Sequence, residues 1–344
     1  MEQTITNLDE LDHYLGSDNY EDILEDEEAR IIAKHRFLVS KGLSHIKIRD
    51  IEKWLKTFQN KLSHRFISVF LLQSITYRNY EMMESAFARK ISKDIKNIYE
   101  EVSPYKSDSL EEWLRLIRYS KIISSHSFAN IHFYCIDKRT SSVTQSSNTI
   151  LRRLSSKVIN HLRILQNIDE VKESIKAKNM VVFIDDFLGS GTQAAKFFND
   201  HEIFELIEID DANQMPLIYM PLMATNTGID NLKSEFPNLR VLPSEIIEED
   251  SKLSKHHSLS DFLQTFDLDI MKIDIEELFI EMQSSYSFIR KNAWLGWTNA
   301  MLSIVFEWGC PNLTVPLIYH DNNKPTTENP DGCNVMYPLA ARRV

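Results

Sequence analysis

The stretch from residue 181 to residue 198 constrains the fold of this chain more than any other. Residues 181–184 read Val-Val-Phe-Ile, an apolar run of strand length, and Asp185 and Asp186 follow at once. Gly189 and Gly191 then stand in a short loop, and Ala-Ala-Lys-Phe-Phe at residues 194–198 favours a helix. A buried strand, a glycine turn and a helix form the repeating unit of parallel α/β sheets, so the sequence predicts such a sheet here.

The two acids make this unit a candidate site. In open α/β folds, ligands bind at the edge of the sheet where the parallel strands end. With the strand predicted to end at Ile184, Asp185 and Asp186 are expected at that edge, partly exposed to solvent. They are the candidate catalytic residues.

The loop after the acids is predicted to bind a phosphate. Glycines let backbone N–H groups approach an anion closely, and the start of a helix carries a partial positive charge. The predicted phosphate-binding residues are Gly189, Ser190, Gly191, Thr192 and Gln193. Because carboxylates repel phosphates, the neighbouring acids are expected to accept hydrogen bonds from ribose hydroxyls or to hold Mg²⁺. A ribose 5-phosphate unit fits both parts.

The rest of the chain is predicted to form a central α/β region between two helical ones. Further strands are predicted at residues 131–136, 216–223 and 239–242. Pro216 and Pro221 weaken a central place in the sheet for the second of these strands. The predicted regions are a helical N-terminal region 1–125, an α/β domain 126–250 and a helical C-terminal region 251–344 with an extended tail packing on the α/β domain. The last region includes tryptophans at helical separations, which are expected in a core: Trp294, Trp297 and Trp308.

The charge of the chain limits its partners. Lys plus Arg number 39 against 50 Asp plus Glu, a formal charge of −11, so direct nucleic-acid binding is not indicated. Residues 138–163 are a local exception, because they hold six basic residues and no acid. Lys138 and Arg139 are favoured as phosphate ligands. Arg152 and Arg153 are equally well explained as solvated helix residues.

An apolar strand, two acids and a Gly-Ser-Gly-Thr loop that opens a helix resemble the signature by which phosphoribosyltransferases bind phosphoribosyl pyrophosphate. The resemblance implies a parallel, doubly wound sheet of the type I phosphoribosyltransferase kind, here with large helical extensions. It assigns the ribose 2′ and 3′ hydroxyls to Asp185 and Asp186 and the 5′-phosphate to the loop 189–193. It also places the family's pyrophosphate loop, which works with Mg²⁺, at Lys138, Arg139, Thr140 and Ser141.

A narrower resemblance spans about residues 45–320. It rests on the loop above, on Ala-Thr-Asn-Thr-Gly at residues 224–228 and on Cys-Pro-Asn-Leu-Thr-Val-Pro at residues 310–316. In these features the chain is similar to phosphoribosyltransferase-like effectors of bacterial conflict systems, some of which accompany retron reverse transcriptases in antiphage loci. The resemblance implies transfer or cleavage at the ribose anomeric carbon in antiphage defence, with a partner such as a reverse transcriptase.

Other functions fit the same residues. A catalytically silent sensor of a phosphoribosyl compound or nucleotide would need the same loop, and a scaffold for a toxin or reverse transcriptase would need neither acid. Two acids after a strand are also typical of ATPases, but the chain has no Gly-x-x-x-x-Gly-Lys-Ser/Thr sequence. No metal-ligand spacing, disulfide framework or membrane segment is evident, which favours a cytoplasmic protein away from membranes.

Overall fold

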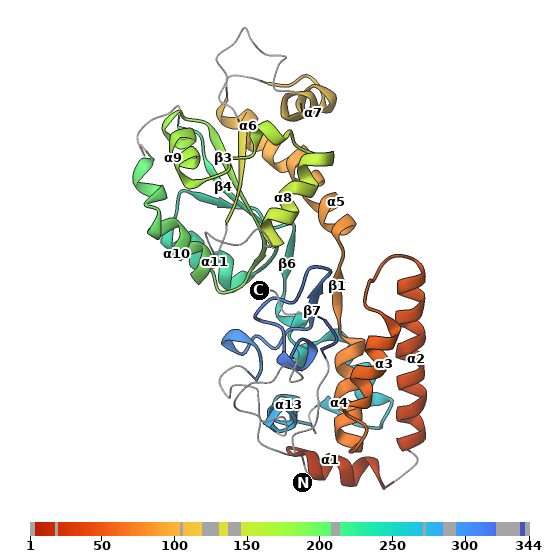
Figure 1. Cartoon of the computed structure of the whole chain (residues 1–344). Helices are drawn as coiled ribbons and strands as arrows, with labels where there is room; N and C mark the ends of the chain where they lie inside the picture. Colours follow the sequence, from red (N-terminus) through yellow and green to blue (C-terminus); the bar gives the residue numbers. More distant parts are fainter. Residues whose placement is uncertain are drawn as a thin grey trace, which may run out of the picture. The chain divides into compact units, whose positions relative to one another are not determined.

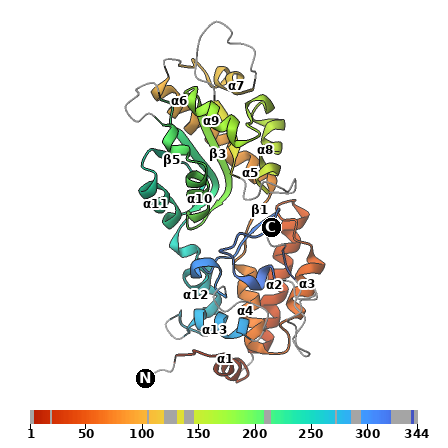
Figure 2. The same cartoon turned by 60° about the vertical axis from the view of Figure 1, so that its left-hand side comes forward.

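A computed structural model describes residues 4–17, 20–103, 106–118, 131–136, 146–207, 214–270, 273–284, 294–320 and 338–340. The chain forms two compact units, residues 1–79 with 248–344, and residues 80–247 (Figures 1 and 2). The three-region division predicted above stays a prediction. Among the described helices, none combines the length and apolar character needed to cross a membrane.

The unit of residues 1–79 and 248–344 is mainly helical. Its helices are α1 (Leu8–Leu15), α2 (Tyr20–Ser40), α3 (Ile48–Lys56), α4 (Leu62–Gln73), α12 (His257–Gln264) and α13 (Ile275–Ser284). Helix α4 contacts all the others in this set, and its residues Phe66, Ile67 and Phe70 are fully buried. Segments from both ends of the chain therefore share one core around α4.

Residues 294–308 lie in the region predicted to be helical, but they form no α-helix. Residues 304–306 form strand β7 (Ile304–Phe306), which pairs in parallel with β1 (Thr76–Arg78). Trp297 lies on a 3-10 turn and is 56% exposed, so its predicted place in a core is wrong. A short buried apolar run such as Ile-Val-Phe suits a strand as well as a helix, and its distant partner strand decides between them.

The unit of residues 80–247 is built on a parallel sheet, which confirms the predicted α/β class. Its strands are β2 (Ile131–Cys135), β3 (Met180–Leu188), β4 (Leu217–Thr225), β5 (Leu239–Val241) and β6 (Glu245–Ile247). They lie in the order β2-β3-β4-β5, with β6 also paired to β4, and every pairing is parallel. Strand β3 is buried along its whole length, as expected for a parallel sheet covered on both faces.

Helices cover both faces of this sheet (Figures 1 and 2). On one face, α9 (Ile168–Lys176), α10 (Thr192–Asp200) and α11 (Asn226–Glu235) share an apolar core with β3, β4 and β5. On the other, α8 (Ser146–Lys157) contacts β2 and β3, and α5 (Tyr80–Lys90) contacts α8 and β4. After α5 come a π-helical turn (Ile91–Ile95), α6 (Lys96–Val102) and α7 (Leu110–Arg118).

The winding of the chain reverses at β2. After α8, Ile164 forms a parallel bridge with Phe133 on the side of β2 away from β3, and Leu165 N–H donates to Phe133 O at 2.9 Å. Helix α9 then leads back across β2 to β3. Right-handed crossovers in opposite directions place their helices on opposite faces, as α8 and α9 are. In open sheets the ligand crevice lies at such a reversal, here at the ends of β2 and β3.

The two prolines weakened the prediction of a central strand, but β4 lies between β3 and β5 in the sheet. Leu242 N–H donates to Tyr219 O at 2.8 Å and Ser244 N–H to Pro221 O at 3.0 Å. The N–H and C=O of one strand residue point to the same side of the strand. The N–H that Pro221 lacks would therefore face the side of Ser244, where β5 has ended and β6 has not begun.

Candidate functional site

The acids lie inside strand β3 rather than after it. Asp185 is 3% exposed and Asp186 is 0% exposed, so the predicted partial solvation of both is wrong. The reason is the length of β4, which pairs with β3 as far as Leu188 opposite Ala224. Paired backbone therefore continues beyond the apolar run, and it carries the acids into the sheet.

Asp185 is held by two hydrogen bonds. Tyr219 Oη donates to Asp185 Oδ2 at 2.8 Å, and the Asp186 N–H donates to Asp185 Oδ1 at 2.8 Å. Tyr219 lies on β4 and is 1% exposed. Sequence reasoning missed this tyrosine, although a buried tyrosine hydroxyl usually has a polar partner. Within a strand, successive side chains point to opposite faces, so Asp186 is directed away from this pair.

Mg²⁺ is one of the ligands that the sequence predicted for these acids. Among the described residues, no three His, Cys, Asp or Glu side chains come together as metal ligands. Mg²⁺ is often held by one or two carboxylates together with substrate phosphates and water. Because Asp185 and Asp186 are buried, they fit direct coordination of a hydrated Mg²⁺ poorly.

The predicted phosphate loop stands at the end of β3. Gly189 and Ser190 are half-buried, and Thr192 is exposed. Gly191 has a φ of 84° and precedes α10 as its N-cap residue, without a side-chain hydrogen bond to the cap. The first backbone N–H groups of a helix have no acceptor within it, so this uncapped start can bind an anion. The hydroxyls of Ser190 and Thr192 lie 3.0 Å apart and add polar groups.

The last residue of β4 and helix α11 hold this loop from one side. Thr225 Oγ1 donates to Gly189 O at 2.7 Å, and Asn231 Nδ2 donates to Ser190 O at 2.9 Å. Gly228 packs so closely that an added Cβ would lie 2.0 Å from Gly189 O. Asn231 was missed by sequence reasoning, because its contact joins residues that are far apart in the chain.

A polar groove of about 760 Å³ extends from the loop between α10 and α11. Ser190, Gly191 and Thr192 line its loop end. Farther along, Lys196 Nζ pairs with Asp200 at 2.6 Å, and Asn199 Nδ2 donates to Glu235 at 2.7 Å. The groove therefore joins the phosphate loop to a surface of mixed charge. Neither Asp185 nor Asp186 lines it.

A family model for PRTase-CE matches residues 51–332. The chain belongs to the PRTase-CE family. This agrees with the resemblance to phosphoribosyltransferases. A comparison with curated proteins finds no match. Among solved structures, the chain is similar to the AQ2163 protein from Aquifex aeolicus at 12% identity and a TM-score of 0.25, over 59% of this chain and 85% of that one.

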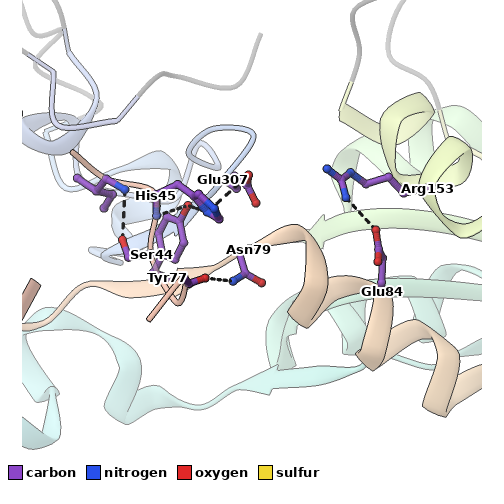
Figure 3. A network of polar contacts seen from close by, with 9 residues as sticks. Ser44, His45, Tyr77, Asn79, Glu84, Arg153 and Glu307 are labelled. Atoms are coloured by element: carbon purple, nitrogen blue, oxygen red, sulfur yellow. Dashed lines mark hydrogen bonds and ion pairs between the residues drawn. The ribbon is translucent and has the colours of Figure 1, made fainter. Parts of the chain in front are cut away.

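In this PRTase-CE protein, part of the basic stretch serves the fold. Arg153 and Lys157 of α8 both pair with Glu84 of α5. Figure 3 shows the pair of Arg153 with Glu84, at 2.9 Å. Burial raises the pKa of Glu84, but hydrogen bonds and charge from Lys157 and Arg153 outweigh this and lower it. Arg163 is buried and donates to Ile131 O at 3.3 Å. The predicted pyrophosphate-loop residues lie outside the described residues: Lys138, Arg139, Thr140 and Ser141.

Proposed function

We propose that this PRTase-CE protein binds a phosphoribosyl ligand, either phosphoribosyl pyrophosphate or a nucleotide, with the ligand's 5′-phosphate at Gly189–Gln193. The observation that carries the proposal is the uncapped start of α10 directly after β3, beside the reversal in the sheet. Membership of a phosphoribosyltransferase-like family supports the same ligand. The type I phosphoribosyltransferase fold is part of this proposal.

The proposed reaction is transfer or cleavage at the ribose anomeric carbon. Such a reaction passes through a cationic sugar, so the protein's tasks are to fix the ribose and to stabilise the departing pyrophosphate. We assign the pyrophosphate to the segment of Lys138 and Arg139, with Mg²⁺ brought by the donor's phosphates. The burial of Asp185 and Asp186 favours a role in supporting the strand that carries the loop over a direct grip on the sugar.

A second candidate function is a catalytically silent sensor that binds the same ligand and regulates a partner. The burial of both acids favours it, because Asp185 and Asp186 are the candidate catalytic residues, whereas a sensor needs only the loop. The enzyme and the sensor bind the same ligand, and only the enzyme turns it over.

Binding and turnover of phosphoribosyl pyrophosphate with Mg²⁺ test the proposal. Calorimetry measures binding, and pyrophosphate release across nucleobases and nucleotides measures turnover. Binding with release supports the enzyme, binding without release supports the sensor, and the absence of binding contradicts both.

A charged variant of the loop sharpens this test. Thr192→Glu places a negative charge at the start of α10, where it stabilises the helix and repels a phosphate. We expect affinity to fall at least about tenfold while thermal stability is kept. Thr192→Gln, which has nearly the same size and no charge, is the matched control. Equal affinities of the two variants would show that the phosphate does not bind at this loop.

A role in antiphage defence, with a partner such as a reverse transcriptase, rests on the narrower resemblance described above. Phage challenge of cells that carry the complete locus, with the wild type or with Thr192→Glu, tests it. We expect protection to be lost with Thr192→Glu and kept with Thr192→Gln. Protection by both variants would favour the scaffold function.

A further inference from the structure

We propose that Thr225 and Asn231 are positioning residues that aim the backbone amides of residues 190–192 at a phosphoryl group. Thr225 ends β4 and Asn231 lies on α11, so neither belongs to the loop itself. The inference rests on the proposed function, which supplies the phosphate. It adds how residues 225–231, which lie outside the loop, hold the loop amides in place before a phosphate binds.

The geometry of the peptide bond carries the argument. In a trans peptide, the C=O of one residue and the N–H of the next point in opposite directions. Thr225 holds the Gly189 carbonyl and Asn231 holds the Ser190 carbonyl. The N–H groups of Ser190 and Gly191 therefore point away from the segment of residues 225–231.

The next peptide unit continues the pattern. Gly191 O accepts the first hydrogen bond of α10, from Ala195 N–H at 2.9 Å, so it points along the helix. The Thr192 N–H consequently points out of the start of the helix. Successive amides of residues 190–192 are thus turned outward because each preceding carbonyl is held inward.

Close packing keeps this arrangement rigid. The space between Gly228 and Gly189 O admits no side-chain atom, and a Cβ on Gly191 would meet Gly228 O at 3.2 Å. Thr225 also accepts a hydrogen bond from Gly228 N–H at 3.0 Å, which caps α11. One hydroxyl therefore fixes both the start of α11 and the carbonyl of the loop. Loop amides that are fixed before binding lose less entropy when a phosphate arrives.

Ribose 5-phosphate binding measured by calorimetry tests the inference, because this probe carries only the phosphate that the loop would hold. Asn231→Leu removes the donor to Ser190 O from an exposed position. Asn199→Leu is the matched control, because it removes a similar bond in the same groove, to Glu235, without contact to the loop. We expect Asn231→Leu to weaken binding roughly two- to tenfold, the range of one hydrogen bond, and Asn199→Leu to leave it unchanged.

Thr225 variants separate positioning from helix capping. Thr225→Ser keeps the hydroxyl and is expected to bind as the wild type does. Thr225→Val loses both hydrogen bonds and is expected to bind less tightly and to unfold at lower urea. Two results together support positioning. Thr225→Ser should bind ribose 5-phosphate as tightly as the wild type, and Asn231→Leu should bind it less tightly while its urea midpoint of unfolding stays unchanged.

Two outcomes overturn the inference in different ways. If the wild type binds ribose 5-phosphate and Asn231→Leu binds it equally well, positioning is wrong and the proposed function stands. If the wild type binds neither ribose 5-phosphate nor phosphoribosyl pyrophosphate, the proposed function fails and the inference fails with it.

Discussion

The hydrogen bond between Tyr219 and Asp185 offers a quantitative test of the buried site. Tyr219→Phe removes only the hydroxyl and leaves Asp185 Oδ2 without the donor that now lies at 2.8 Å. Both side chains are nearly inaccessible, at 1% and 3% exposure, so water does not readily replace the lost donor. Leaving a buried acceptor without its donor costs about 1–3 kcal/mol, and we expect the free energy of unfolding to fall by that amount.

Asp185→Asn perturbs the same contact from the other side. The asparagine has one acceptor oxygen, whereas Asp185 accepts from both Tyr219 and the Asp186 N–H. One of these donors then faces an NH₂ group, so we expect a loss of about 1–3 kcal/mol. The double variant should lose less than the sum of the single losses, because both changes remove the same interaction.

Urea unfolding of the full chain measures these differences. Asp200→Asn is the control, since Asp200 pairs with Lys196 at 2.6 Å on the surface, where such a pair contributes at most about 1 kcal/mol. The reasoning is refuted if Tyr219→Phe lies within about 0.5 kcal/mol of the wild type, or if the losses of the double variant add fully. Either result would mean that the buried hydroxyl does not hold the carboxylate.

Other predictions follow from single contacts. Gly228→Ala forces a methyl group against Gly189 O, 2.0 Å away, and should cost about 1–3 kcal/mol in urea unfolding and weaken ribose 5-phosphate binding; unchanged affinity would contradict the close packing. Glu84→Gln should lower stability by about 1–2 kcal/mol at pH 7 and by less at pH 4. The pKa of Glu84 is lower in the folded than in the unfolded state, so its carboxylate stabilises the fold at pH values above the unfolded pKa, and this stability is lost as pH falls. A pH-independent loss would contradict the ion pairing. Burial and the neighbouring His257 lower the pKa of His256 to about 4. Stability should therefore fall as pH drops from about 6.5 to 4, where the unfolded state binds the extra proton, and His256→Gln should flatten this part of the profile.

Much of the central unit could be predicted from local sequence. The apolar runs at β3 and β4 predicted parallel strands, because residues buried on both faces need no polar alternation. The glycine at residue 191 predicted a turn, and it adopts a positive φ at the start of α10. These properties depend on neighbours in the chain, so they can be predicted without knowledge of the fold.

The burial of the two acids could not be predicted in this way. The sequence shows Asp185 and Asp186 after an apolar run, but whether they reach solvent depends on how far β4 pairs beside them. The same applies to Ile304–Phe306, whose conformation is decided by a partner strand more than two hundred residues earlier in the chain. Pairing over such distances is set by the whole fold.

The strand, the glycine loop and the helix that make an anion site possible follow from the sequence alone, because backbone conformation there depends on residue type. The burial of the acids and the contacts of Thr225 and Asn231 with the loop arise from the packing of the whole fold. The physical reason is that burial and side-chain contacts between strands belong to the packing of distant segments. No single segment carries that information.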